Sequence, residues 1–324
     1  ATAAPLNPAY KPDEFKFFLE DTKATAILTG SSGADIAIEA APEGIKLVQL
    51  EIDHAGDVKL SSDAQPSQSN YITDPQPSDV ALILHTSGTT SRPKMVPLTH
   101  YNLTSSIDNI IATYGLSDND ISLCIMPLFH VHGLMASTLS TLSSGGTVVV
   151  PPRFNALQFL RIAEEQQFTW YTAVPSIHQA LLSRSQNREK EFRIPSLRFI
   201  RSCSSALAPS TMHSVEEIFQ VPVLEAYGMT EASHQMSSNP MPPGHRIPGS
   251  VGLGTGVNIG IMNESGQLLE PGSRGEVVIN GPNVFGGYEE NPEANATAFD
   301  HGWFRTGDEG ALDSNGYLSL LGRI

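Results

Sequence analysis

Short apolar runs alternate with amphipathic segments along residues 13–226. Runs that end in proline, glycine or polar clusters are typical of buried strands, and apolar residues spaced three or four apart are typical of helices. The pattern predicts strands over residues 26–29, 47–52, 80–84, 121–126, 147–150, 169–174, 197–200 and 221–226. It predicts helices over residues 13–22, 99–114 with Thr99 as N-cap, 134–142, 156–166, 176–185 and 210–219. This alternation favours the α/β class, with doubly wound, mostly parallel sheets flanked by helices.

The pattern changes after Gly249. Short apolar segments at residues 257–262, 275–279 and 317–321 are separated by glycine-containing turn signals, which is typical of antiparallel β-structure. We therefore expect an α/β core over residues 1–248, followed by a small distorted β-barrel subdomain over residues 249–321. Residues 61–79 are rich in Ser, Asp, Gln and Pro and predict a flexible connection.

Four polar clusters follow predicted strands, at residues 86–94, 129–132, 201–205 and 227–231. Ligands of doubly wound sheets bind beyond the carboxyl ends of the strands. The coincidence of four such clusters therefore predicts a ligand site at this edge of the sheet, although each cluster alone is equally typical of a polar surface loop.

The segment Thr86–Lys94 combines five hydroxyl side chains with a glycine, an arginine and a lysine. Hydroxyls, backbone N–H groups and a lysine are suited to binding polyphosphate. The segment is not a Walker A loop, because that motif needs a second glycine before the lysine and a Ser or Thr after it, where this chain has Met95. We expect a phosphate-binding loop of another fold.

Composition narrows the partners. The formal net charge of −15 argues against a general nucleic-acid or anionic-membrane surface, so an anionic ligand needs a local positive pocket. Cys124 and Cys203 are too few for a disulfide framework, which favours a reducing compartment such as the cytoplasm. No apolar run approaches the length of a transmembrane helix. Both ends of the chain look truncated, and we expect a fragment.

Four ordered motifs resemble those of the acyl-adenylating superfamily, which contains acyl-CoA synthetases, peptide-synthetase adenylation domains and luciferase. They are Thr86–Lys94, Tyr227–Glu231, Arg305–Asp308 and Gly322–Arg323. The resemblance covers essentially the whole chain and implies the large N-terminal domain of such an enzyme. Residues 127–133, 198–209 and 229–236 more narrowly resemble the oxalate–CoA ligases of plants and fungi.

The resemblance implies conversion of oxalate, ATP and CoA to oxalyl-CoA, AMP and pyrophosphate through an acyl-adenylate. Glu231 would hold Mg²⁺, Thr230 would contact the α-phosphate, and both would be catalytic. The nucleotide contacts implied by the motifs are Thr86, Ser87, Gly88, Thr89, Thr90 and Lys94 for the β- and γ-phosphates, Ser205, Ala206, Glu225, Ala226 and Tyr227 for adenine, and Asp308 and Arg323 for the ribose. Alone, Asp308 in a Thr-Gly-Asp segment would be assigned to an Asx turn.

Oxalate has no hydrocarbon tail, so its pocket should be small and rich in donors. We expect His130, Ser204 and His234 to contact it, with His130 also catalytic beside the reacting carboxylate. Each of these histidines could instead be a structural residue whose hydrogen bonds are satisfied within the protein. Arg201 is expected either as a cation behind the pocket or as the ion-pair partner of Glu225. His130 and His132 lack the third ligand that a zinc site needs.

The chain departs from the superfamily at two places. Glycine is usual after the loop lysine, where it serves a tight backbone approach or a positive φ, and Met95 would resist either and weaken ATP binding. Residues 322–324 would begin a hinge to a C-terminal domain that carries a catalytic lysine, and both that domain and part of the first subdomain before Ala1 are expected to be missing.

Two other functions remain open. The chain is either a CoA ligase for an aromatic or medium-chain acid, or a truncated, inactive ATP-binding module. As a fragment it should have low activity by itself. The expected partners are small molecules only, with neither nucleic acid nor membrane insertion, and the compartment is the cytoplasm or, because some relatives carry a C-terminal signal, the peroxisome.

Overall fold

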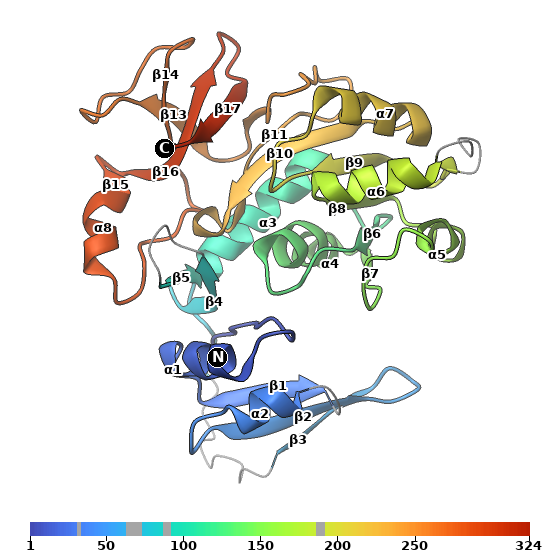
Figure 1. The fold of residues 1–324 in the computed structure, drawn as a ribbon, viewed down its shortest axis with the longest axis vertical. Coiled ribbons are helices and arrows are strands. Elements are labelled where there is room, and N and C mark those ends of the chain that lie inside the picture. The colour runs from blue at the N-terminus through green and yellow to red at the C-terminus, as the bar shows by residue number, and fades with distance from the viewer. Residues whose placement is uncertain (31–33, 63–72, 87–91, 186–191) are drawn as a thin grey trace. The chain divides into compact units, whose positions relative to one another are not determined.

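The computed structural model describes residues 1–30, 34–62, 73–86, 92–185 and 192–324. The chain divides into two compact units, Ala1–Gln76 and Pro77–Ile324 (Figure 1). Every sequence-predicted site residue belongs to the second unit. Within the described ranges, no helix is long and apolar enough to cross a membrane.

The first unit is a small three-stranded sheet with two helices. Its elements are α1 (Pro12–Asp21), β1 (Ala26–Gly30), α2 (Asp35–Glu39), β2 (Lys46–Ile52) and β3 (Val58–Ser62). Strands β1 and β2 pair in parallel, and β2 and β3 pair antiparallel. Phe15, Phe18 and Leu19 are the buried residues of α1, consistent with its amphipathic sequence. The sequence predicted α1, β1 and β2 but not α2 or the exposed strand β3.

The second unit is built on a seven-stranded sheet. Its order is β12 (Leu253–Gly254), β11 (His234–Ser238), β10 (Val223–Met229), β9 (Phe199–Ser202), β8 (Trp170–Ala173), β6 (Ile121–Cys124) and β7 (Thr147–Val149). The strands from β7 to β10 are parallel, whereas β11 and β12 are antiparallel additions at one edge. The predicted mostly parallel sheet is therefore correct, with a mixed edge that the sequence did not indicate.

Helices cover both faces of this sheet (Figure 1). They are α3 (His100–Tyr114), η1 (His132–Leu139), α4 (Ser140–Ser143), α5 (Phe159–Gln166), α6 (Pro175–Ser185) and α7 (Pro209–Phe219). One core cluster joins sheet residues to α5, α6 and α7, for example Phe159, Leu181 and Val215. A second cluster joins the other face to α3, through Ile110 and Tyr114. This two-sided burial is the doubly wound arrangement that the apolar runs predicted.

Three boundaries differ from the prediction in ways that matter for the site. Strand β10 continues through residues 227–229, so Tyr227 is a strand residue and not part of a following loop. The helix predicted from residue 134 begins at His132 and is a π-helix, η1, over its first eight residues. Helix α5 begins at Phe159 rather than 156. The N-cap of α3 is confirmed, since the Thr99 side chain accepts from the Asn102 backbone N–H at 3.1 Å.

The strand that precedes the predicted phosphate loop is not part of the parallel sheet. Strands β4 (Val80–Thr86) and β5 (Lys94–Thr99) form an antiparallel pair, in which Thr86 lies opposite Lys94. Leu82 and Leu98 are buried in the largest core cluster of the unit. The buried character of residues 80–84 was predicted correctly, but their partner strand was missed because the sequence treated residues up to Lys94 as loop.

Beyond residue 254 the chain forms a second antiparallel sheet. Its elements are β13 (Asn258–Met262), β14 (Arg274–Asn280), α8 (Pro292–Ala298), β15 (Phe299–Asp300), β16 (Trp303–Leu312) and β17 (Leu318–Arg323). The sequence missed β16, because Arg305–Asp308 interrupts its apolar pattern with polar residues and a glycine of positive φ. Strand β16 pairs with β14, β15 and β17 and therefore carries Asp308 beside the end of β17.

Candidate functional site

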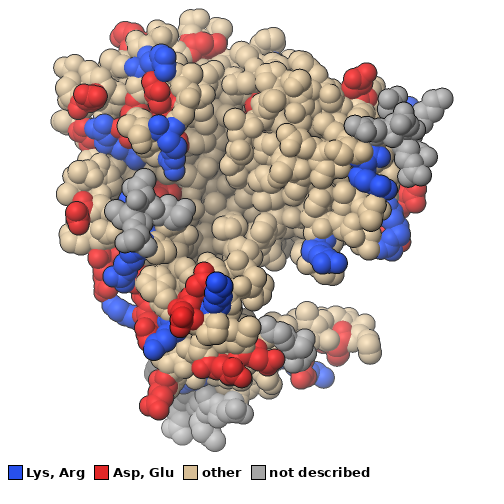
Figure 2. All heavy atoms as spheres, viewed as in Figure 1, with Lys and Arg blue, Asp and Glu red and all other residues tan. Residues whose placement is uncertain are grey.

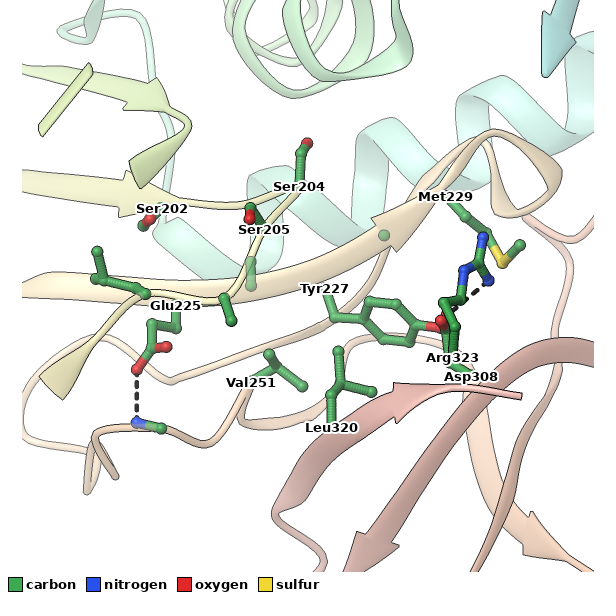
Figure 3. Close-up of a pocket in the computed structure, with 15 residues that line it drawn as sticks. Ser202, Ser204, Ser205, Glu225, Tyr227, Met229, Val251, Asp308, Leu320 and Arg323 are labelled. Atoms are coloured by element: carbon green, nitrogen blue, oxygen red, sulfur yellow. Dashed lines mark hydrogen bonds and ion pairs between the residues drawn. The ribbon is translucent and has the colours of Figure 1, made fainter. Parts of the chain in front are cut away.

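A pocket of about 300 Å³ lies where the ends of β9 and β10 face the C-terminal sheet (Figure 3). Eight of the sequence-predicted site residues line it, namely Ser204, Ser205, Ala206, Glu225, Ala226, Tyr227, Asp308 and Arg323. They come from the loop after β9, from β10, from β16 and from β17. The sequence thus identified most of one cavity from segments that lie more than a hundred residues apart.

One end of the pocket is formed by Tyr227, Asp308 and Arg323 (Figure 3). The Tyr227 hydroxyl donates to the Asp308 carboxylate, and Arg323 Nη1 lies 3.0 Å from Asp308 Oδ1. Burial, and then the charge of Asp308, raise the pKa of Tyr227, so its phenol stays a donor at neutral pH. Asp308 lies within β16 and not in an isolated Asx turn, because the strand pairing with Arg323 continues through it. The carboxylate is therefore fixed in place.

The other end of the pocket contains Glu225 (Figure 3). Its Oε2 accepts from the Gly249 backbone N–H at 2.9 Å. Burial raises the pKa of this carboxyl to about 7, and the Gly249 bond opposes the rise. The predicted alternative of an Arg201–Glu225 ion pair is wrong. Arg201 lies opposite Leu224 in the paired strands, and Glu225 is the next residue, so the two side chains point to opposite faces of the sheet. The Arg201 side chain instead bonds Tyr114, Thr172 and Gln235.

The raised pKa of Glu225 makes stability depend on pH. Between the ordinary value of 4.5 and about 7, the folded state binds more protons at this carboxyl than the unfolded state, so stability falls as pH rises through that window. Glu225→Gln removes the titration and keeps an acceptor for Gly249. The free energy of unfolding of the variant, measured relative to that of the parent, should be higher at pH 8 than at pH 4.5 by about 1–2 kcal/mol, after allowance for solvent screening. Urea unfolding of both proteins at both pH values measures this change. The same difference in unfolding free energy between variant and parent at the two pH values would contradict the prediction.

Two histidines lie behind Ser204. The rings of His132 and His234 stack with centroids 5.3 Å apart and an interplanar angle of 21°. His132 Nδ1 is 2.9 Å from Ser204 Oγ, and His132 Nε2 is 2.6 Å from Thr172 Oγ1. Among the described residues, the buried Nε2 of His234 has no hydrogen-bond partner. Burial, followed by the charge of the buried Arg201, lowers the pKa of both imidazoles well below the usual value, so both are neutral.

The structure links Ser204 and His234 through His132, which contacts both, and it leaves His130 apart. His130 is exposed, and its ring lies against Phe129 with centroids 4.7 Å apart. In the part of the chain that the structure describes, no hydrogen bond or ring contact joins His130 to Ser204 or His234. His132 lies in one of the predicted strand-end loops but was not among the residues expected to contact oxalate. Its position at the start of a helix following a strand was the available signal.

Glu231 belongs to a second polar group that extends from the end of β10. Thr230 and Glu231 form a short 3₁₀ turn, η3 (Thr230–Ala232). Tyr288 Oη donates to Glu231 Oε1 at 2.9 Å, and Lys94 Nζ lies 4.7 Å from the centroid of the Tyr288 ring. Burial raises the pKa of Glu231, while Tyr288 and Lys94 oppose that rise. The sequence indicated Glu231 and Lys94 but missed Tyr288, which it passed over as the residue after the turn signal Gly286–Gly287.

Tyr288→Phe should weaken this group without unfolding the chain. The phenylalanine ring keeps the contact with Lys94, but the Glu231 carboxylate loses a donor worth about 1.5–3 kcal/mol. We expect the Mg²⁺ concentration needed for half-maximal activity to rise about tenfold, in step with that loss. The measurement is a Mg²⁺ titration of ATP–pyrophosphate exchange by the complete protein. Tyr101→Phe, at an exposed tyrosine, is the matched control, and equal Mg²⁺ requirements for both variants would contradict the prediction.

The donor set around Glu231 fits a Mg²⁺ ion bound mainly through phosphates. Among the described residues, no group of three or more His, Cys, Asp and Glu is arranged to hold a metal. One buried carboxylate, with one oxygen fixed by Tyr288, is what Mg²⁺ commonly takes from a protein when nucleotide phosphates supply further ligands. Glu231 is thus the carboxylate available to such an ion.

Part of the predicted phosphate loop lies outside the described residues, namely Ser87, Gly88, Thr89, Thr90 and Ser91. Thr86 and Lys94 are described and flank it as paired residues of β4 and β5. The concern that Met95 would have to adopt a positive φ was wrong, and its effect on ATP binding stays a prediction. Met95 is a buried strand residue opposite His85 and is absent from the positions of positive φ, because strand pairing gives it an extended backbone.

Charged residues do not form a broad basic surface over the face seen in Figure 2. Acidic and basic side chains are interspersed around the C-terminal sheet, and uncharged surface covers the centre of the larger unit. The pocket contains one cation, Arg323, beside the carboxylates of Asp308 and Glu225, so its lining is not predominantly positive as the net charge had led us to expect.

Comparisons with known proteins agree with this geometry. A model described as AMP-binding enzyme matches residues 1–289. The chain is 50% identical over 333 residues to the oxalate–CoA ligase of Arabidopsis thaliana, covering 100% of this chain and 64% of that protein. It is 45% identical over 349 residues to the oxalate–CoA ligase of Saccharomyces cerevisiae, covering 99% and 63%. It is 33% identical over 321 residues to the sulfoacetate–CoA ligase of Cupriavidus necator, covering 98% and 62%. The chain spans a little less than two thirds of these relatives.

Solved structures share the fold. Apo MatB from Rhodopseudomonas palustris matches with a TM-score of 0.84 and 30% identity, over 99% of this chain and 63% of that one. MenE from Bacillus subtilis, in complex with ATP and magnesium ion, matches with a TM-score of 0.82 and 28% identity, over 99% and 64%. The predicted fold class and superfamily are thereby confirmed. By its motifs, its fold and the family model that covers most of its length, the chain belongs to the family of AMP-binding enzymes, the acyl-adenylating group.

Proposed function

We propose that this chain is the nucleotide-binding and acid-binding part of an ATP-dependent acid–CoA ligase that activates oxalate. The observation that carries the proposal is the position of Ser204. It lines the pocket that contains Tyr227 and Asp308, and it also contacts the stacked histidine pair through His132. A nucleotide in the pocket would therefore lie next to a small polar group of donors.

The nucleotide part of the proposal rests on the two ends of the pocket. Tyr227 would pack on adenine with Ser205, Ala206, Glu225 and Ala226 around it, and Asp308 and Arg323 would bind the ribose hydroxyls. The Asp308 carboxylate is already fixed by Tyr227 and Arg323, so little ordering remains for binding to impose. Thr86, Lys94 and the residues between them would contact the outer phosphates, and Thr230 the α-phosphate.

The chemistry would be attack of an oxalate oxygen on the α-phosphorus, with pyrophosphate leaving. CoA thiolate would then attack the acyl carbon, and AMP would leave. Both partners of the first step are anions, so charge neutralisation and positioning provide most of the acceleration. Mg²⁺ held by Glu231 would neutralise charge on the phosphates. Lys94 would add a cation on the leaving group.

The acid part of the proposal rests on polarity. Ser204 and His234 would contact oxalate, with His132 behind Ser204 and His130 at the exposed side of the loop. An aromatic or medium-chain acid needs an apolar tunnel, whereas the group described here consists of hydroxyls and imidazoles. The named relatives at 50% and 45% identity act on oxalate by their names, which supports the same choice.

The test is ATP–pyrophosphate exchange by the complete natural protein with a panel of acids. Oxalate should give the fastest exchange, and oxalyl-CoA should form when CoA is added. Acetate, sulfoacetate and coumarate should be slower by at least about tenfold, the effect of one lost charged contact. Fast exchange with coumarate and none with oxalate would establish the other acid–CoA ligase, and no exchange with any acid would favour an inactive ATP-binding module.

A further inference from the structure

Arg201 is a fully buried cation with no anionic partner among the described residues. It is 0% exposed, and none of the ion pairs in the described ranges includes it. Its Nε donates to Tyr114 Oη at 2.8 Å, its Nη1 to Thr172 Oγ1 at 3.1 Å and its Nη2 to Gln235 Oε1 at 3.1 Å. All three acceptors are uncharged. A buried, uncompensated charge typically costs several kcal/mol, so a purely structural role would be better served by apolar packing.

The groups facing Arg201 keep its charge uncompensated. Tyr114 comes from α3, and burial raises the pKa of its phenol, so no phenolate forms beside the guanidinium. Gln235, from β11, offers Arg201 an uncharged amide oxygen. The side chain of Cys203, which follows β9, also lies beside the guanidinium. His132 and His234 are neutral. The guanidinium thus supplies the one permanent charge of this buried group.

A chain of hydrogen bonds runs from Arg201 to the pocket. Arg201 Nη1 donates to Thr172 Oγ1, and His132 Nε2 lies 2.6 Å from the same oxygen. In the arrangement proposed below, the Thr172 hydroxyl donates to Nε2, and His132 carries its proton on Nδ1 and donates it to Ser204 Oγ at 2.9 Å. Because Ser204 accepts from His132, its own hydroxyl proton is free to point into the pocket that Ser204 lines.

We propose that Arg201 is a positioning and specificity-determining residue which, through Thr172 and His132, orients the Ser204 hydroxyl as a donor to a doubly charged acid. Its role as a specificity determinant rests on the function proposed above. The order of donors runs in one direction, from the guanidinium to the pocket, so each hydroxyl along it is polarised toward an incoming anion. The fixed cation behind them favours a dianion over a monoanion, because Coulomb attraction scales with ligand charge.

The substitution Arg201→Met tests the hydrogen-bond chain from Arg201 to Ser204. Methionine approximates the length of arginine without its charge or donors, and the acceptors keep other partners, since Tyr114 Oη also bonds Ser238 and Gln235. In ATP–pyrophosphate exchange by the complete protein, the KM for oxalate should rise at least tenfold, with the KM for ATP within twofold. The preference for oxalate over acetate should fall by a similar factor. Arg161→Met, at an exposed arginine, is the matched control.

Nitrogen NMR of the histidine side chains tests the mechanism without any substrate. The spectrum of His132→Gln identifies the His132 signal among the ten histidines. In the parent protein, His132 should be neutral with its proton on Nδ1 between about pH 6 and pH 8. In Arg201→Met the Nδ1 preference should be lost and the pKa of His132 should rise, because the cation that helps to lower it is gone.

The outcomes separate the two proposals. A His132 proton on Nε2 in the parent protein would overturn the role of Arg201, and that measurement stands even if Arg201→Met does not fold. An unchanged KM for oxalate in a folded Arg201→Met variant would overturn it as well. Absence of oxalate exchange in the parent protein, together with the Nδ1 tautomer, would instead reject oxalate as substrate and retain the hydrogen-bond chain.

Discussion

Glu231→Gln is expected to lower the rate of ATP–pyrophosphate exchange by about 10²–10³-fold, the range seen when one transition-state charge contact is removed. Glutamine has the shape of glutamate and can still accept from Tyr288, so the fold should be retained. It lacks the charge that a hard cation such as Mg²⁺ prefers. The exchange rate at saturating Mg²⁺ and the Mg²⁺ dependence together measure the effect.

The control for this variant is Glu264→Gln, which removes the same charge from an exposed turn. The global charge changes equally in the two variants, so any difference between them belongs to the site. If Glu231→Gln exchanged pyrophosphate within threefold of the parent rate, Glu231 would not be the metal carboxylate. A larger loss of thermal stability than of activity would point to a structural role instead.

Gly228→Ala is expected to cause the largest loss of stability among the conservative changes in the pocket. An added Cβ would lie 2.0 Å from the backbone oxygen of His234 and 2.7 Å from its carbonyl carbon. Backbone atoms of the adjoining strand cannot move aside cheaply, so the free energy of unfolding should fall by about 3 kcal/mol or more. Urea unfolding followed by tryptophan fluorescence measures this loss.

The variant should also move His234, since the added carbon would approach the imidazole Nδ1 to 3.2 Å. Stacking with His132 would be disturbed, and the KM for oxalate should rise in any protein that still folds. Gly286→Ala is the matched control, because nothing lies within 4 Å of its added Cβ and it has no positive φ. Equal stability of the two variants would mean that β10 and β11 can separate at Gly228 at little cost.

The sequence predicts the α/β architecture well because the parallel strands are buried on both faces. Strands such as β8 and β9 are entirely buried, and the short apolar runs at residues 169–174 and 197–200 that contain them end in proline or polar residues, which favours strands over longer helices. Strand β16 was missed for the opposite reason. Only three of its ten residues are fully buried, and the polar segment Arg305–Asp308 is held by partners distant in sequence.

Part of the candidate site could be predicted from the sequence. Tyr227, Glu231 and Asp308 carry recognisable motifs, and their neighbours in space follow from the carboxyl ends of strands. Tyr288 and Thr172 carry no such signal. Their contacts, with Glu231 and His132 respectively, join residues 57 and 40 positions apart and depend on side-chain direction, which one-dimensional patterns do not contain. The Arg201–Glu225 pairing failed on that same side-chain direction.

The position of the His132 side chain depends on the number of residues in the π-helix η1 as well as on their identity. A π turn holds one more residue than an α turn, and such turns are often found at functional sites. Deleting one residue between Leu134 and Leu139 would restore α geometry and rotate the preceding residues by about 100° relative to the following helix. His132 could then no longer reach Ser204 while α4 keeps its packing. In aligning this chain with a homologue whose helix is purely α, the gap therefore belongs inside η1, even where residues on either side look equally similar.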